Sequence, residues 1–98
     1  MKKFLLIALV LLSGCVGQVT VGEYVSAGCV RSCEQFDGDK SDGPCLSNNI
    51  ERDWVCDIAH NPREAVDDLA ENQCEKFLSG EANHFVEVTP SCEIIMVQ

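Results

Sequence analysis

The stretch from Asp53 to Gly80 reads DWVCDIAHNPREAVDDLAENQCEKFLSG. Its first part alternates apolar and polar side chains and is predicted as a strand over residues 53–59, although its spacing also fits a helix. We favour the strand because Asn61, Pro62 and Glu64 follow as helix N-cap, first helical residue and capping-box partner. Apolar residues then recur at intervals of three and four. We therefore expect one long helix over about 62–79, which Gly80 ends.

Two segments rich in β-branched residues, 85–88 and 93–97, flank a Thr-Pro-Ser turn and predict a hairpin at the end of the chain. The second segment is apolar at consecutive positions, which favours a central strand. A right-handed crossover through the long helix would make the first two strands parallel and leave room for the third between them. The expected fold is α+β, a β-α-β-β arrangement with a three-stranded sheet of order 1-3-2.

Seven cysteines in 98 residues indicate a cross-linked domain. A short N-terminal helix over 26–36, with Ser26 as N-cap, would place two of them one turn apart on one face. Six cysteines allow three disulfides in fifteen connectivities, each stabilising a small domain by about 2–4 kcal/mol. The six are Cys29, Cys33, Cys45, Cys56, Cys74 and Cys92.

A zinc site is the alternative for some of these cysteines. Cys29 and Cys33, together with Cys56 and His60, have the pairwise spacing of a four-ligand site. An exported protein enters an oxidising compartment, where thiols form disulfides, so we favour disulfides over a zinc site.

The first fifteen residues have the features of a secretory signal: Lys2 and Lys3, an apolar run over 4–12, two small residues and Cys15. The run is too short to span a membrane, which takes about twenty residues. Leu12-Ser13-Gly14-Cys15 resembles the lipobox of prokaryotic membrane lipoproteins, bacterial or archaeal. The resemblance implies that residues 1–14 are removed and that Cys15 carries the lipid. An ordinary cleaved signal, which would leave Cys15 as a thiol, is the alternative.

The chain is therefore predicted to consist of a signal peptide (1–14), a lipidated N-terminus and tether (15–24) and a cysteine-rich domain (25–98). The resemblance to a lipobox implies that the protein is anchored by lipid on the extracytoplasmic side of the cell membrane.

The net charge is −9 for the whole chain. Removal of residues 1–14 takes away two of the seven basic side chains and none of the sixteen acidic ones, which leaves −11. This charge argues against nucleic acid and against an anionic lipid surface as partners, because both require basic residues.

Two acidic groups are candidate sites. Asp37, Asp39 and Ser41 match the first three ligand positions of a calcium loop, although the glycine and the closing glutamate of such a loop are absent. Four residues of the predicted long helix lie at intervals of four, three and four and would form one acidic ridge, a docking face for a basic partner protein. They are Glu64, Asp68, Glu71 and Glu75.

The chain has neither a nucleophile elbow nor a phosphate-binding glycine loop. We therefore expect no enzyme and no cofactor, but a lipid-anchored, non-catalytic surface module that binds a partner or serves a structural role. An exported calcium-binding protein that uses loop 37–42 is the alternative.

Overall fold

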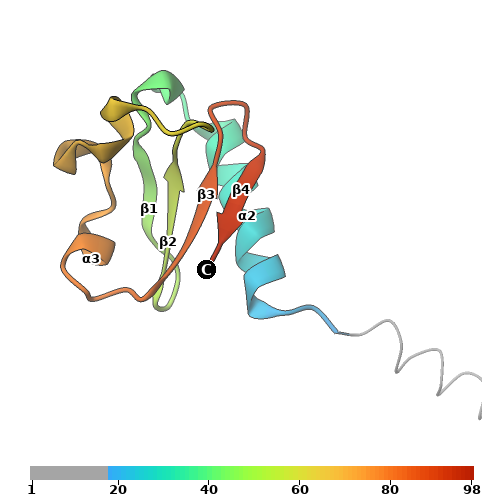
Figure 1. Cartoon of the computed structure of the whole chain (residues 1–98). Coiled ribbons are helices and arrows are strands. Elements are labelled where there is room, and N and C mark those ends of the chain that lie inside the picture. Colours follow the sequence, from blue (N-terminus) through green and yellow to red (C-terminus); the bar gives the residue numbers. More distant parts are fainter. Residues whose placement is uncertain (1–17) are drawn as a thin grey trace, which may run out of the picture.

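The computed structural model describes residues 18–98, so the predicted signal peptide and Cys15 lie outside the described residues. The described part contains the helix α2 (Val21–Gln35) and a four-stranded sheet. Its strands are β1 (Cys45–Glu51), β2 (Trp54–Ile58), β3 (His84–Val88) and β4 (Ile94–Val97). They lie side by side in chain order, with the central pair β2 and β3 parallel and both outer pairs antiparallel (Figure 1).

Helix α2 begins at a threonine cap. The hydroxyl oxygen of Thr20 accepts a hydrogen bond from the backbone N–H of Glu23 at 3.1 Å, as an N-cap does. Ser26, the predicted N-cap, instead lies inside the helix and donates its hydroxyl to the Gly22 carbonyl. The helix therefore starts within the segment predicted as a tether, because Thr20 with Glu23 is the better cap.

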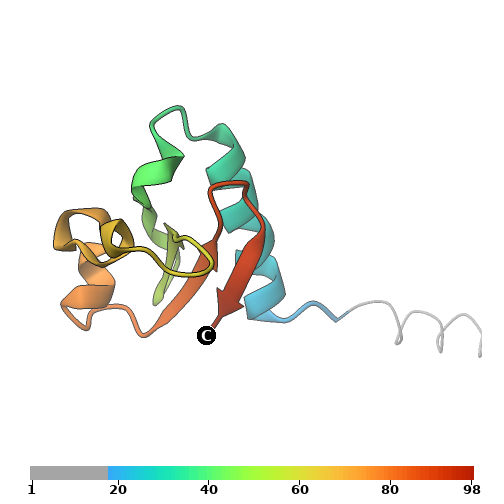
Figure 2. The same ribbon diagram turned by 45° about the horizontal axis from the view of Figure 1, so that its top comes forward.

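The core lies between α2 and one face of the sheet. Strand alternation points Cys56 and Ile58 of β2, and Val86 and Val88 of β3, at this face, where Val25 of α2 packs against them. The chain from 59 to 83 that connects β2 to β3 lies on the opposite side of the sheet from α2 (Figure 2). The fold thus has three layers: the helix, the sheet and the irregular connection.

The prediction of one long helix over 62–79 is wrong. The connection contains two 3₁₀ turns, η2 (Ala65–Asp68) and η3 (Ala70–Asn72), and a single turn of α-helix, α3 (Glu75–Leu78). Side chains bind the backbone groups that a continuous helix would use: the amides of Asn72 and Gln73 donate to the carbonyls of Val66 and Asp67. Such local hydrogen bonds offer the backbone an alternative to the helix, and they divide it into short pieces.

The predicted three-stranded sheet of order 1-3-2 is also wrong. Strand β1, whose sequence CLSNNIE shows no regular alternation, adds a fourth strand beside β2. β3 pairs directly with β2, and β4 pairs with β3 at the edge, so its apolar sequence does not mark a central strand. Ile94, Met96 and Val97 are accordingly exposed. The strand at β2 and the terminal hairpin are confirmed.

All six predicted cysteines form disulfides. Cys29–Cys56 joins α2 to β2, and Cys33–Cys92 joins α2 to the turn between β3 and β4. Cys45–Cys74 joins β1 to the residue before α3. The first pair removes the zinc alternative, because Cys29 and Cys56 are bonded to each other.

Candidate functional site

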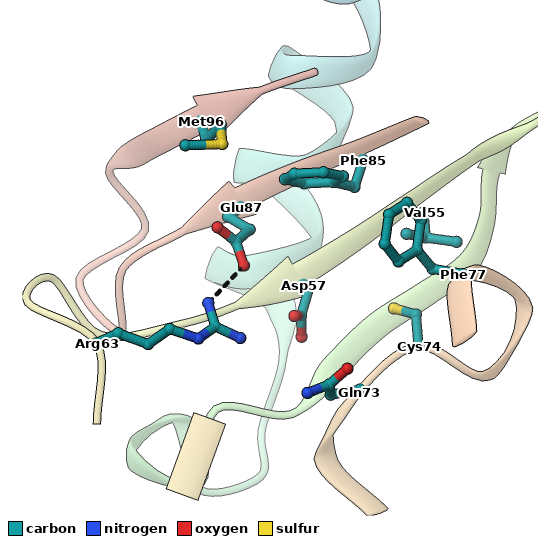
Figure 3. Close-up of a pocket in the computed structure, with 9 residues that line it drawn as sticks. All are labelled: Val55, Asp57, Arg63, Gln73, Cys74, Phe77, Phe85, Glu87 and Met96. Atoms are coloured by element: carbon teal, nitrogen blue, oxygen red, sulfur yellow. Dashed lines mark hydrogen bonds and ion pairs between the residues drawn. The ribbon is translucent and has the colours of Figure 1, made fainter. Parts of the chain in front are cut away.

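A pocket of about 350 Å³ lies on the face of the sheet opposite α2, between the strands and the connection (Figure 3). The three strands β2, β3 and β4 form its floor, and the connection forms its wall. The lining residues are Val55, Asp57, Arg63, Gln73, Cys74, Phe77, Phe85, Glu87 and Met96.

The parallel register of β2 and β3 builds the floor. It sets Val55 beside Phe85 and Asp57 beside Glu87. These residues alternate with the core residues along both strands, so they point away from α2 and into the pocket. The floor therefore has an apolar half and an acidic half.

Two aromatic rings border the apolar half, one in the floor and one in the wall. Phe77 of α3 meets Phe85 of β3 edge to face, with ring centroids 5.1 Å apart. The Cys45–Cys74 disulfide fixes the start of α3 to β1 and so positions Phe77. The pocket is partly open: Phe77 is 40% exposed and Met96 44%.

In the acidic half, Glu87 is paired. Arg63 donates from Nη1 to Oε2 of Glu87 at 3.0 Å and from Nε to Oδ1 of Asp68 at 2.8 Å. These hydrogen bonds, that with Asp68 foremost, raise the pKa of Arg63, so it remains a cation. Arg63 thus holds the connection to β3 across the pocket rim.

Asp57, in contrast, has one unpaired oxygen. Its Oδ1 is buried and finds no hydrogen-bond donor among residues 18–98. Burial, followed by the charge of Glu87, raises the pKa of Asp57 from 3.8 to about 8, and Arg63 offsets only part of this. At neutral pH the carboxyl is therefore mostly protonated. Buried polar groups without partners are rare in native proteins and call for an explanation.

A second buried carboxylate is fully satisfied. Asp67 accepts hydrogen bonds from the backbone N–H groups of His60 and Glu64, both at 2.9 Å, and its Oδ1 lies 3.0 Å from Nδ1 of His60. Burial alone would raise the pKa of Asp67, but these hydrogen bonds outweigh it and lower the pKa. Gly43 packs directly on this carboxylate. The cluster fixes the start of the connection to the loop that precedes β1.

In the predicted calcium loop, the Asp39 carboxylate forms hydrogen bonds within the loop. The Asp39 carboxylate accepts from the backbone N–H of Ser41 at 2.9 Å and from its hydroxyl, which lowers the pKa of Asp39. Asp37, Asp39 and Ser41 are all exposed. Within residues 18–98 no three or more His, Cys, Asp or Glu side chains gather as a metal site would need.

The predicted acidic ridge depended on the long helix, and without that helix its four residues do not form one face. Glu64 caps η2, Asp68 lies in η2 and pairs with Arg63, Glu71 lies in η3, and Glu75 begins α3. All four are exposed, but they belong to separate turns.

The pocket was not predicted from the sequence. One signal was present: Asp57 and Glu87 occupy the same fourth position in two otherwise mostly apolar strands, WVCDI and HFVEV. The shared position brings the two carboxyl groups together only because the two strands pair in parallel and in register.

The fold and its three disulfides define a small cysteine-rich α+β domain, a class typical of extracellular compartments. Comparisons with protein-family models, with curated proteins and with solved structures find no match to this chain. In the part of the chain that the structure describes, no helix has the length and apolar character to cross a membrane.

Proposed function

We propose that this chain is an exported lipoprotein, anchored through Cys15 on the extracytoplasmic side of the cell membrane, and that its domain is a non-catalytic binding module. Its binding site is the pocket over β2, β3 and β4. The observation that carries the binding role is the carboxyl group of Asp57, which lines a partly open, largely apolar pocket and whose buried Oδ1 has no donor among residues 18–98.

The three disulfides support export, because such bonds persist in oxidising compartments. The lipobox-like sequence that ends at Cys15 supports the anchor. Helix α2 begins at Val21, so only five residues separate Cys15 from the domain, which would lie close to the lipid headgroups.

The composition of the pocket supports binding. Ligand sites in proteins are typically concave, about 300–1,000 Å³ in volume, mostly apolar and supplied with a few fixed polar groups. This pocket matches that description. An unpartnered buried carboxyl group does not stabilise a fold, since an apolar side chain of similar size would avoid its desolvation. A ligand cation that contacts the Asp57 carboxyl would offset this cost.

The intact mass of the protein extracted from membranes tests the anchor. We expect a diacylated species that begins at Cys15 and gains six hydrogens on reduction of its three disulfides. A Cys15→Ser variant should lose the lipid and leave the membrane fraction. An unmodified Cys15 in the extracted protein, or a gain of only four hydrogens, contradicts the scheme.

A fragment screen followed by backbone amide NMR tests the pocket. We expect bound fragments to shift the resonances of Val55, Phe85 and Met96, and we expect Phe77→Ser to abolish these shifts because it removes one wall. Leu78→Ser is the matched control, because Leu78 is exposed and does not line the pocket. The binding role is refuted if no fragment binds, or if the shifts fall on other surfaces.

A further inference from the structure

The two carboxyl groups of the pocket are in different states of pairing. Asp57 and Glu87 lie beside each other in the register of β2 and β3, and both side chains point into the same space (Figure 3). Arg63 pairs with Glu87 and leaves Oδ1 of Asp57 without a donor. The floor thus presents two adjacent carboxyl groups, one of which has no donor to its buried oxygen, and aromatic rings lie beside them.

Resting on the proposed function, we infer that the pocket binds a small organic cation, a primary ammonium group on a short apolar or aromatic body. The ammonium group donates to Asp57 with Glu87 beside it, and the body packs against Val55, Phe85 and Met96.

An ammonium group suits this floor better than other ligands. It carries three donors and a positive charge, and charge-assisted hydrogen bonds to a carboxylate are the strongest that a pocket can offer it. A neutral apolar ligand would leave Asp57 unpaired, at the cost of its desolvation.

An anionic ligand is disfavoured by the same residues. Arg63 is the cation among the lining residues, and its guanidinium is already bonded to Glu87 and Asp68. Residues 18–98 carry five basic side chains against sixteen acidic ones, so the long-range field attracts cations and repels anions.

The test compares two probes of equal shape, 2-phenylethylamine and 2-phenylethanol, by calorimetry at pH 8.5. An alkylammonium group, like that of Lys, keeps its proton at this pH. We expect the amine to bind at least tenfold more tightly than the alcohol. Asp57→Asn should reduce the amine affinity at least tenfold and leave that of the alcohol unchanged. Asp37→Asn, which removes the same charge from an exposed loop, should change neither.

The wild-type protein provides a second test that needs no variant. The carboxyl of Asp57, faced by Glu87 of β3 and by Arg63 and Asp67 of the connection, must lose its proton when the ammonium binds. The amine affinity should therefore rise up to about tenfold per pH unit from pH 6 to 8. Calorimetry in two buffers of different ionisation enthalpy should show release of up to one proton.

Each outcome has a distinct meaning. Equal binding of amine and alcohol, or amine binding without proton release and independent of Asp57, overturns the ammonium inference and leaves the pocket a binding site. Binding of neither probe also overturns the inference, whereas the proposed binding role falls only if the fragment screen fails as well, with no fragment bound or with all shifts on other surfaces.

Discussion

Replacing Asp57 by Asn should remove the largest pH dependence that a single buried group gives to the stability of this domain. The carboxyl group has a pKa of about 8 in the folded protein and 3.8 as its ordinary value. Below pH 3.8 it is protonated in both folded and unfolded chains and favours neither. As the pH rises from 3.8 to 8, the unfolded chain ionises freely while the folded domain holds the proton, so the domain loses stability.

The magnitude follows from this difference. Between the two pKa values the free energy of unfolding falls by up to about 1.4 kcal/mol per pH unit. From pH 6 to pH 8 the slope flattens near the folded pKa, which leaves a total loss of about 2 kcal/mol by the same relation. Asn has nearly the same shape as a protonated Asp and does not ionise, so Asp57→Asn should keep the stability that the wild type loses.

Urea unfolding at pH 6, 7 and 8, with the disulfides intact, measures this effect. We expect the wild-type free energy of unfolding to fall by about 2 kcal/mol over this range, and that of Asp57→Asn to change by less than about 0.5 kcal/mol. Asp37→Asn is the control for the loss of one negative charge and should follow the wild type. A flat wild-type profile, or an equal fall in the Asp57 variant, would refute the assignment of a buried, protonated carboxyl at the pocket floor.

Three further predictions concern the scaffold and are measured by urea unfolding. Thr20→Ala should destabilise the domain by about 1 kcal/mol through loss of the α2 cap, and Thr20→Ser should not; equal losses would show that the cap contributes nothing. Gly43→Ala should cost at least about 1–3 kcal/mol, because Gly43 has φ +66° and a Cβ there would collide with the Asp67 carboxylate. The double change Cys45→Ala and Cys74→Ala should cost about 2–4 kcal/mol and weaken fragment binding, because this bridge positions the pocket wall. Unchanged stability in either of the last two variants would contradict its argument.

Local patterns in the sequence were sufficient for some elements. The alternation of Trp54, Cys56 and Ile58 predicted β2, and the β-branched ends of the chain predicted the β3–β4 hairpin. The even set of six cysteines after Cys15 predicted three bridges. These features depend on the side-chain period of a strand and on cysteine arithmetic, both of which are visible without a fold.

The prediction of a long helix failed because local side-chain hydrogen bonds outweighed the apolar pattern. The apolar spacing from Ala65 to Leu78 fits a helix, but the amides of Asn72 and Gln73 bind the backbone carbonyls that a helix would use. The calcium hypothesis and the lipid anchor at Cys15 stay predictions, the latter with its own test in the mass of the mature protein.

The sequence by itself determined the number of bridges, the net charge and the position of three strands, because composition and short-range periodicity are properties of the chain. Only the tertiary structure decided the sheet order, the disulfide partners and the pocket. The parallel pairing of β2 with β3 sets Asp57 beside Glu87, thirty residues apart in the chain. Packing beneath the connection then excludes water from Oδ1 of Asp57, and Arg63 pairs with Glu87. Burial and pairing of this kind arise from long-range contacts, which no local pattern encodes.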